Sequence, residues 1–320
     1  MIKTIEYKIA QSESEWCRYR IENMGIRESF DRLCNAVRRK ILKVCICAVR
    51  TFRFSMKNKV FHPTYIKNKE NIVVSMTSIA GRIKDIYPAI NSIITQTQKP
   101  DLIVLWLGDN CSYPKRTISK IEAMGIKVEY CNDLGPNTKY HYAFKEYNND
   151  LVITVDDDII YHEKMIEELY STHLKHPEMI IARRVHKIRF GLDRLPVSYR
   201  NWIWEYRNSC QPSHELLATG VGGVLYTPAV MKLNCWETTD FINVCPACDD
   251  IWLKFCELSQ NIKVCAVDGS QFYKDAINKK TQKNALALEN VDNEKNDERL
   301  SSCARYFGMS NLCEKVLEEE

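Results

Sequence analysis

Three consecutive carboxylates, Asp156, Asp157 and Asp158, directly follow the apolar residues 151–155. Like charges this close together repel one another strongly unless a cation lies among them. Loop carboxylates suit Mg²⁺ or Mn²⁺, which commonly share their remaining coordination positions with substrate phosphates. A cation held there would neutralise a diphosphate and stabilise it as a leaving group. The triplet therefore predicts a site for Mn²⁺ or Mg²⁺.

The alternative interpretation is that the aspartates begin a helix over residues 159–170, because Asp is favoured in the first turn of a helix. One aspartate is enough for that role. Three in a row at the end of a strand favour the metal site.

A second acidic pair, Asp249 and Asp250, opens the helix that apolar spacing predicts over residues 249–259. Successive residues of a helix are rotated by about 100°, so the two carboxylates should point to different sides. One can bind a backbone group while the other faces a substrate. A carboxylate placed in this way can act as a general base.

Lys139 lies at the start of a helix predicted over residues 138–147. A cation at a helix N-terminus is unfavourable unless an anion is bound there. We therefore expect Lys139, together with Thr138, to contact a diphosphate. The alternative is a solvated loop lysine.

Aromatic and basic side chains alternate further along the chain, where Tyr199, Trp202, Trp204 and Tyr206 are interleaved with arginines. Aromatic rings could form a platform for an acceptor sugar. The alternative is a core strand with a lid.

The order of predicted elements indicates an α/β fold. Strands at residues 72–76, 102–107, 126–131 and 151–155 alternate with helices at 82–97, 115–124 and 138–147. This alternation predicts a doubly wound, mostly parallel sheet flanked by helices. The second half is less regular, with helices at 163–175 and 249–259, strands at 179–183 and 262–267, and a tight turn into a strand at 220–226. Ligands of such sheets bind at the carboxyl ends of the strands.

Composition divides the 320 residues into three parts: a basic amphipathic helical extension (1–70), a catalytic domain (71–275) and a C-terminal helical tail (276–320). Residues 32–69 contain eleven Lys or Arg and no acid. Such a helix can lie on an anionic membrane surface or pack on the domain. Its longest apolar run, residues 44–49, is too short to span a bilayer.

Cysteine is abundant, with fourteen residues, and the chain starts without the apolar segment of a signal peptide. The cysteines are scattered singly, unlike those of a short disulfide-stapled chain. We therefore expect reduced thiols in a cytoplasmic protein. The basic extension could hold this protein at the inner face of a membrane. The single Cys-x-x-Cys, at Cys245 and Cys248, has no second ligand pair, so packing is favoured over a zinc or redox site.

Several of these features together resemble the family 2-like glycosyltransferases of the GT-A type fold, of the kind that assembles bacterial surface polysaccharides. The Asp-x-Asp after the fourth strand, the Gln-Thr-x-x-Pro join at residues 96–100 and the Gly-rich turn at 220–226 are similar to that family's motifs. The pair at 249–250 resembles an acidic pair that is usually Glu-Asp. The resemblance runs over residues 71–267.

The resemblance implies a role for each matching residue. Thr77 matches the position at which these enzymes contact the nucleotide base. Asp156 matches an aspartate near the ribose and the metal, and Asp158 matches a metal ligand. Asp157 contacts the donor if the register slips by one residue. Asp250 matches the general base, although Asp at position 249 leaves the choice between the two open.

The resulting hypothesis is a metal-dependent, inverting transfer of a sugar from a nucleotide diphosphate donor, with uridine as the expected base, to a glycan or lipid-linked acceptor hydroxyl. A nucleotidyltransferase would also use an Asp cluster, but it should carry a Gly-rich phosphate loop, and residues 77–82 hold one glycine. A non-enzymatic protein binding nucleic acid through residues 32–69 would leave the aspartates without a role. No nucleic-acid partner is therefore expected.

Overall fold

The computed structural model describes residue 54 and residues 59–192, 196–207, 211–231, 238–278 and 295–309. The chain divides into two units, Met1–Val49 and Arg50–Glu320, and every described residue lies in the second. The extension predicted over residues 1–70 therefore lies mostly outside the described residues, and its helix stays a prediction. Within the described residues, no helix is long and apolar enough to cross a membrane.

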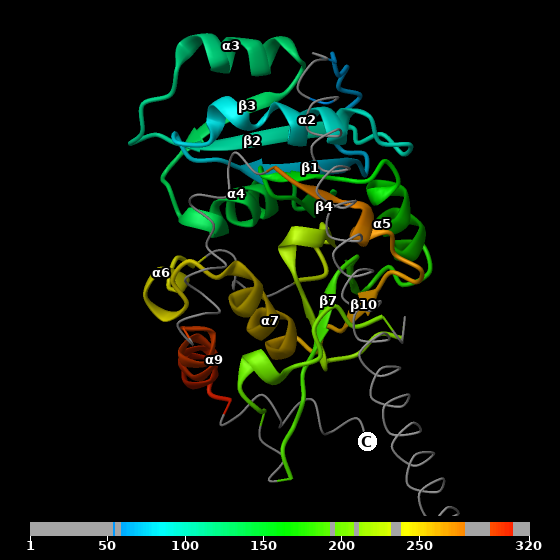
Figure 1. Ribbon diagram of the computed structural model, residues 1–320, viewed down its shortest axis with the longest axis vertical. Coiled ribbons are helices and arrows are strands. Elements are labelled where there is room, and N and C mark those ends of the chain that lie inside the picture. Colours follow the sequence, from blue (N-terminus) through cyan, green and yellow to red (C-terminus); the bar gives the residue numbers. More distant parts are fainter. Residues whose placement is uncertain are drawn as a thin grey trace, which may run out of the picture. The chain divides into compact units, whose positions relative to one another are not determined.

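A seven-stranded sheet forms the centre of the described chain, with the strand order β10-β6-β9-β4-β1-β2-β3 (Figure 1). All neighbouring strands are parallel except β9, which is antiparallel to both β4 and β6. The predicted mostly parallel sheet is confirmed. Its strands are β1 (Ile72–Thr77), β2 (Leu102–Gly108), β3 (Lys127–Cys131), β4 (Leu151–Thr154), β6 (Ile180–Ala182), β9 (Val224–Tyr226) and β10 (Val264–Ala266).

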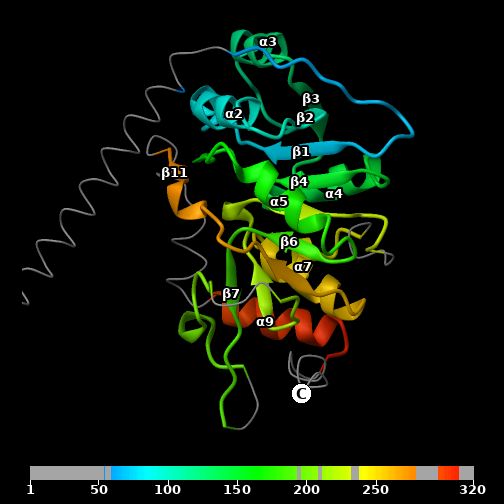
Figure 2. The same cartoon turned by 90° about the vertical axis from the view of Figure 1, so that its right-hand side faces the viewer.

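Helices cover both faces of this sheet (Figure 2). Alternate residues of β1 enter two separate cores, because side chains of a strand point to opposite faces in turn. Val73 packs in the core with the first group of helices, whereas Val74 and Met76 pack in the core with the second. The first group is α4 (Thr138–Glu146), α6 (Phe241–Val244), α7 (Asp249–Ser259) and α9 (Lys295–Tyr306); the second is α2 (Tyr87–Ile94), α3 (Lys115–Ala123) and α5 (Met165–His173).

Local sequence explains where these elements begin. The helix expected over residues 82–97 is split into the 3-10 turn η1 (Ile83–Asp85) and α2, with Pro88 in the first turn of α2. Proline has no backbone N–H to donate and is tolerated only at such a position. Every residue of β2 is buried, as expected for a parallel strand covered on both faces.

Two short antiparallel pairs lie outside the main sheet. β5 (Ile159–Ile160) pairs with β11 (Ala276–Ile277), and β7 (Val185–Lys187) pairs with β8 (Leu216–Ala218). The first pair shows that the alternative of a helix starting at residue 159 is wrong, since residues 159 and 160 are extended and α5 begins only at Met165. The aspartate triplet is thus followed by a strand and does not cap a helix.

The described residues after 275, which are 276–278 and 295–309, pack on the domain. β11 pairs with β5, and α9 lies against α7 (Figures 1 and 2), where the Trp252 ring meets Tyr306 and Phe307 at centroid distances of 5.4 and 5.2 Å. This helix lies within the C-terminal helical tail predicted over residues 276–320. Residues 279–294 and 310–320 of the predicted tail lie outside the described residues.

Candidate active site

The aspartate triplet occupies the loop between β4 and β5, at the carboxyl end of the sheet, and its members point in different directions. Asp157 is buried; it accepts the Ser78 hydroxyl hydrogen bond at 2.5 Å and pairs with Arg82 at 3.0 Å. Asp158 is partly exposed and lies 3.4 Å from the same guanidinium. Asp156 pairs with Lys139. Asp157 is therefore tied to the loop after β1, while Asp156 and Asp158 stay accessible in part.

Crowding of these carboxylates changes their acidity. Burial, followed by repulsion from Asp156 and Asp157, raises the pKa of Asp158 to about 6. Burial also raises the pKa of Asp157. Repulsion between the carboxylates, which was expected from three adjacent aspartates, adds to the effect of burial, and a bound cation would relieve it.

Arg82 is a site residue that the sequence analysis missed. It precedes η1 in the loop after β1. Its guanidinium pairs with both Asp157 and Asp158, and its buried Nε has no hydrogen-bond partner among the described residues. An arginine shortly after a strand that ends beside an acidic loop was the available signal, because parallel strand ends meet at one edge of the sheet.

Lys139 connects the two acidic groups of the site. Its side chain is buried in the first turn of α4, and its Nζ lies 2.6 Å from Asp156 Oδ1 and 3.0 Å from Asp249 Oδ2. Burial lowers the pKa of Lys139, but Asp156, Asp249 and Asp250 together outweigh this and raise it well above its usual value. The solvated-loop alternative is therefore wrong. The contact between Lys139 and a diphosphate stays a prediction.

Asp249 and Asp250 lie in the first turn of α7 and point to different partners, as the helical geometry predicts. Asp249 binds Lys139, whereas Asp250 accepts the backbone N–H of Gly220 at 2.9 Å. A side chain at Gly220 would crowd this arrangement, since its Cβ would lie 3.2 Å from Lys139 Nζ and 3.3 Å from Asp250 Oδ1. Burial, then repulsion from Asp249, raises the pKa of Asp250 to about 8.

Thr77 lies at the end of β1, at the same edge of the sheet. Its hydroxyl donates to the carbonyl of Trp106 at 3.0 Å, so it is already engaged with β2. Its predicted contact with a nucleotide base stays a prediction.

The residues fit a cation that arrives together with phosphate groups. Among the described residues, no three His, Cys, Asp or Glu side chains are grouped so as to hold a metal alone. Asp156 and Asp158 offer two partly exposed carboxylates. Mg²⁺-like ions are commonly bound by one or two carboxylates plus water and substrate phosphates, which matches this donor set.

The aromatic segment is mainly packing. Tyr199 and Trp202 are buried and contact each other at 4.9 Å between ring centroids. Trp204 is 39% exposed, with its ring 4.8 Å from that of His186. Cys245 and Cys248 are buried free thiols, in keeping with their interpretation as packing residues.

Comparison with known proteins identifies the domain. Residues 77–226 match the family described as glycosyl transferase family 2. The chain contains a family 2 glycosyltransferase domain. The match includes Thr77, Lys139 and the aspartate triplet, whereas Asp249 and Asp250 follow it. The protein is thus a glycosyltransferase, as the resemblance had implied.

Solved structures resemble this glycosyltransferase only distantly. One is CMP:2-keto-3-deoxy-manno-octonic acid synthetase complexed with CTP, with 10% identity over 62% of this chain and 90% of the other, at a TM-score of 0.40. Another is glucosyl-3-phosphoglycerate synthase from Mycobacterium tuberculosis with Mn²⁺, uridine diphosphate and glucosyl-3-phosphoglycerate, with 15% identity over 38% of this chain and 48% of the other, at 0.30. The chain spans about half the length of that synthase. No curated protein matches. These structural likenesses carry no functional argument.

The raised pKa of Asp250 generates a prediction about the stability of the glycosyltransferase. Between about pH 4 and 8 the folded protein keeps a proton on Asp250 that the unfolded chain loses, so this carboxyl's contribution to stability is present below pH 4 and is lost as pH rises through 8. Asp250→Asn, which stays neutral, should gain in unfolding free energy relative to the wild type as pH rises. The gain should be up to about 1.4 kcal/mol per pH unit.

Urea unfolding at several pH values across this window measures the difference. Asp268→Asn, which removes an exposed aspartate, is the matched control. Parallel pH dependences for Asp250→Asn and Asp268→Asn would contradict the prediction.

Proposed function

We propose that this glycosyltransferase moves a sugar from a uridine diphosphate sugar to an acceptor hydroxyl, with inversion at the anomeric carbon and with Mn²⁺ or Mg²⁺ as cofactor. One observation carries the proposal: Lys139 joins Asp156 of the loop after β4 to Asp249 of the acidic pair that begins α7. These two acidic groups are 93 residues apart and meet at one end of the sheet. The arrangement supports a site in which the donor side, at Asp156–Asp158, adjoins the acceptor side, at Asp249 and Asp250.

On the donor side, Asp158 and Asp156 would hold the cation, which on binding would neutralise the diphosphate and favour its departure. Thr77 would contact the base and Asp156 would also lie near the ribose. Asp157 anchors this loop through Ser78 and Arg82. Lys139 would face the phosphates, because its positive charge, which its raised pKa retains, attracts their negative charge. Arg82 keeps the acidic loop in place through its contacts with Asp157 and Asp158.

On the acceptor side, Asp250 would take the proton from the acceptor hydroxyl. The hydroxyl oxygen then forms its bond to the anomeric carbon while the bond from that carbon to the diphosphate oxygen breaks, and the electron pair leaves with the diphosphate. A raised pKa suits this task, because a base works best when its pKa is near the operating pH. Asp249, held by Lys139, would position the pair.

The first test measures donor turnover by the purified full-length protein. We expect release of uridine diphosphate from a uridine diphosphate sugar in Mn²⁺ and none in EDTA. Asp158→Asn should abolish turnover and remove the Mn²⁺-dependent part of uridine diphosphate binding, measured by calorimetry, while raising the melting temperature of the free protein by relieving repulsion. Full activity in EDTA would exclude the metal site, and release of pyrophosphate would favour a nucleotidyltransferase.

The acidic pair supplies a second prediction. Asp250→Asn keeps the shape and removes the basicity, so kcat should fall by about 10²-fold or more with donor affinity little changed. Asp249→Asn should cost less in kcat and more in acceptor KM. For the wild type, kcat/KM should rise with pH until about 8, where Asp250 loses its proton. If Asp249→Asn lowers kcat more than Asp250→Asn does, Asp249 is the base and Asp250 the positioning residue. If kcat falls by only a few-fold in both variants, neither carboxylate is catalytic.

We further propose that residues 32–69 contact an anionic membrane surface and that the acceptor is a lipid-linked glycan of a bacterial surface polysaccharide, assembled on the cytoplasmic face. The motivation is the run of eleven basic residues without an acid. A juxtamembrane base is worth about 1 kcal/mol near an anionic leaflet, so several together suffice for membrane residence.

Removal of residues 1–53 tests this proposal. The deletion takes away seven of the eleven bases and leaves Phe54, whose carbonyl accepts a hydrogen bond from Asn91. Binding to anionic liposomes should be lost and donor hydrolysis kept. Replacing Arg38, Arg39, Lys40 and Lys43 by glutamine is the matched control for charge, and neutral liposomes are the control for lipid. Unfolding of the deleted protein would indicate that the segment packs on the domain, and preferential binding to nucleic acid would favour the nucleic-acid alternative.

A further inference from the structure

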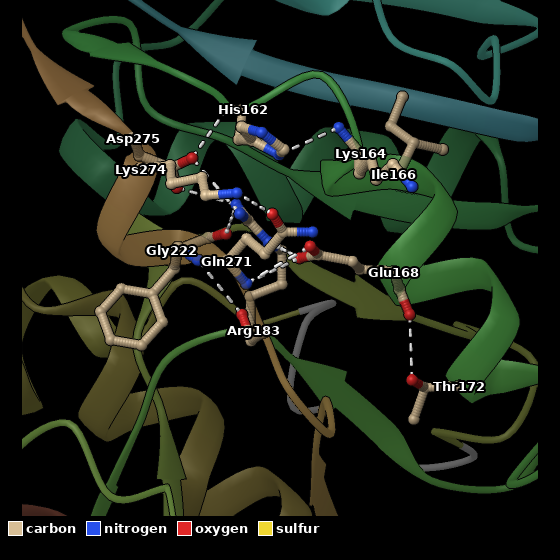
Figure 3. A network of polar contacts seen from close by, with 12 residues as sticks. His162, Lys164, Ile166, Glu168, Thr172, Arg183, Gly222, Gln271, Lys274 and Asp275 are labelled. Atoms are coloured by element: carbon tan, nitrogen blue, oxygen red, sulfur yellow. Dashed lines mark hydrogen bonds and ion pairs between the residues drawn. The ribbon is translucent and has the colours of Figure 1, made fainter. Parts of the chain in front are cut away.

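Arg183, which follows β6, lies at the centre of a buried polar network (Figure 3). Its side chain is fully buried. Its Nε lies 2.7 Å from Glu168 Oε2, and its Nη1 and Nη2 lie 2.8 and 3.3 Å from the two oxygens of Asp275. Its Nη1 also donates to the carbonyl of Gly222 at 3.0 Å. One guanidinium thus binds a helix, a C-terminal segment and a turn.

Through Asp275, Arg183 is linked to the loop that carries Asp156–Asp158, which is the metal-binding loop of the proposed function. Asp275 Oδ1 also accepts the backbone N–H of His162 at 2.7 Å. The chain then continues from Asp275 into β11, which pairs with β5, and the N–H of Asn278 donates to the carbonyl of Asp158 at 2.8 Å. The segment 275–278 therefore lies alongside the loop that carries the aspartates.

Through Gly222, Arg183 is linked to the catalytic pair. Gly222 ends the 3-10 turn η4 (Gly220–Gly222), whose first N–H is donated to Asp250. The backbone N–H of Arg183 also donates to the carbonyl of Gly223 at 3.4 Å. No side chain can replace the hydrogen of Gly222, because its Cβ would lie 2.7 Å from that of Arg184. The turn is thus held closely against Arg183 and its neighbour.

We propose that Arg183 is a positioning residue for sugar transfer, which fixes the metal-binding loop and the turn that binds Asp250 relative to each other. The inference rests on the proposed function, since it concerns the geometry of that site. A planar, forked guanidinium can bind a carboxylate with two nitrogens and a carbonyl at the same time, whereas an ammonium is a compact point charge. The identity of the residue therefore matters as well as its charge.

A set of conservative variants of the full-length protein tests this role. Arg183→Lys keeps the charge and loses the fork. Asp275→Asn keeps the shape of the partner and loses its charge. The matched control is Arg299→Lys, which alters a buried arginine of α9 that donates to Asn296 Oδ1 at 3.2 Å and is outside the network. For each variant, circular dichroism gives the folded fraction, calorimetry gives the affinity for uridine diphosphate with Mn²⁺, and kinetics gives kcat and KM.

We expect Arg183→Lys to lower kcat by about 10- to 100-fold and to weaken uridine diphosphate binding in Mn²⁺ by about tenfold, per folded molecule. Asp275→Asn should show a smaller change in the same direction. The two effects should not add in the double variant, because the residues are in contact. Arg299→Lys should change the melting temperature alone.

Unchanged kcat and affinity per folded molecule in Arg183→Lys would overturn the inference and leave a purely structural ion pair. If Arg183→Lys does not fold, the same measurements on Asp275→Asn decide, and wild-type constants there would likewise overturn it. The wild type serves to separate the two proposals. Absence of donor turnover by the wild type contradicts the proposed function, whereas normal turnover by both the wild type and the variants contradicts only the role of Arg183.

Discussion

The ion pairs of Lys139 hold the two acidic halves of the site together, and the rest of the arrangement depends on them. Five aspartates gather at this end of the sheet against two cationic side chains, Lys139 and Arg82. The excess is negative, so a diphosphate entering alone would meet net repulsion. A divalent cation would offset two of those charges, which is a physical reason for the proposed metal dependence that does not rely on family resemblance. Burial, and after it repulsion from the neighbouring aspartates, raises the pKa values of Asp158 and Asp250.

The first half of the fold could be predicted from the sequence because each element there is long and strongly patterned. The apolar runs of β1, β2 and β4 are buried on both faces, and the helix α3 buries one side, at Ile118 and Ile121. The helix α7 begins and ends at the predicted residues, Asp249 and Ser259. The position of the aspartate triplet at the carboxyl edge of the sheet followed from a general property of parallel sheets.

What the sequence could not show depends on contacts between distant segments. β5 and β11 have two residues each, too few to carry a period, and they exist because they pair across 116 residues. Arg82 and Arg183 become site residues only through partners that other elements bring to them. Lys139 was singled out correctly as a charge at a helix start, but its burial between two carboxylates required knowing where α7 begins in space.

The reversed direction of β9 has a consequence for how such an enzyme could change its acceptor. Because β9 is antiparallel to β4, its first residue, Val224, lies opposite the last residue of that strand, Thr154. β9 therefore begins at the edge of the sheet where the parallel strands end. The turn η4, whose Gly220 N–H binds Asp250, lies just before it in the chain. β7 and β8, which precede this turn in the chain, pair with each other outside the main sheet. Under the proposed role of Asp250, insertions or exchanges in the segment of β7 and β8 would change the acceptor side of the site without altering the strand order of the main sheet that carries the aspartate loop.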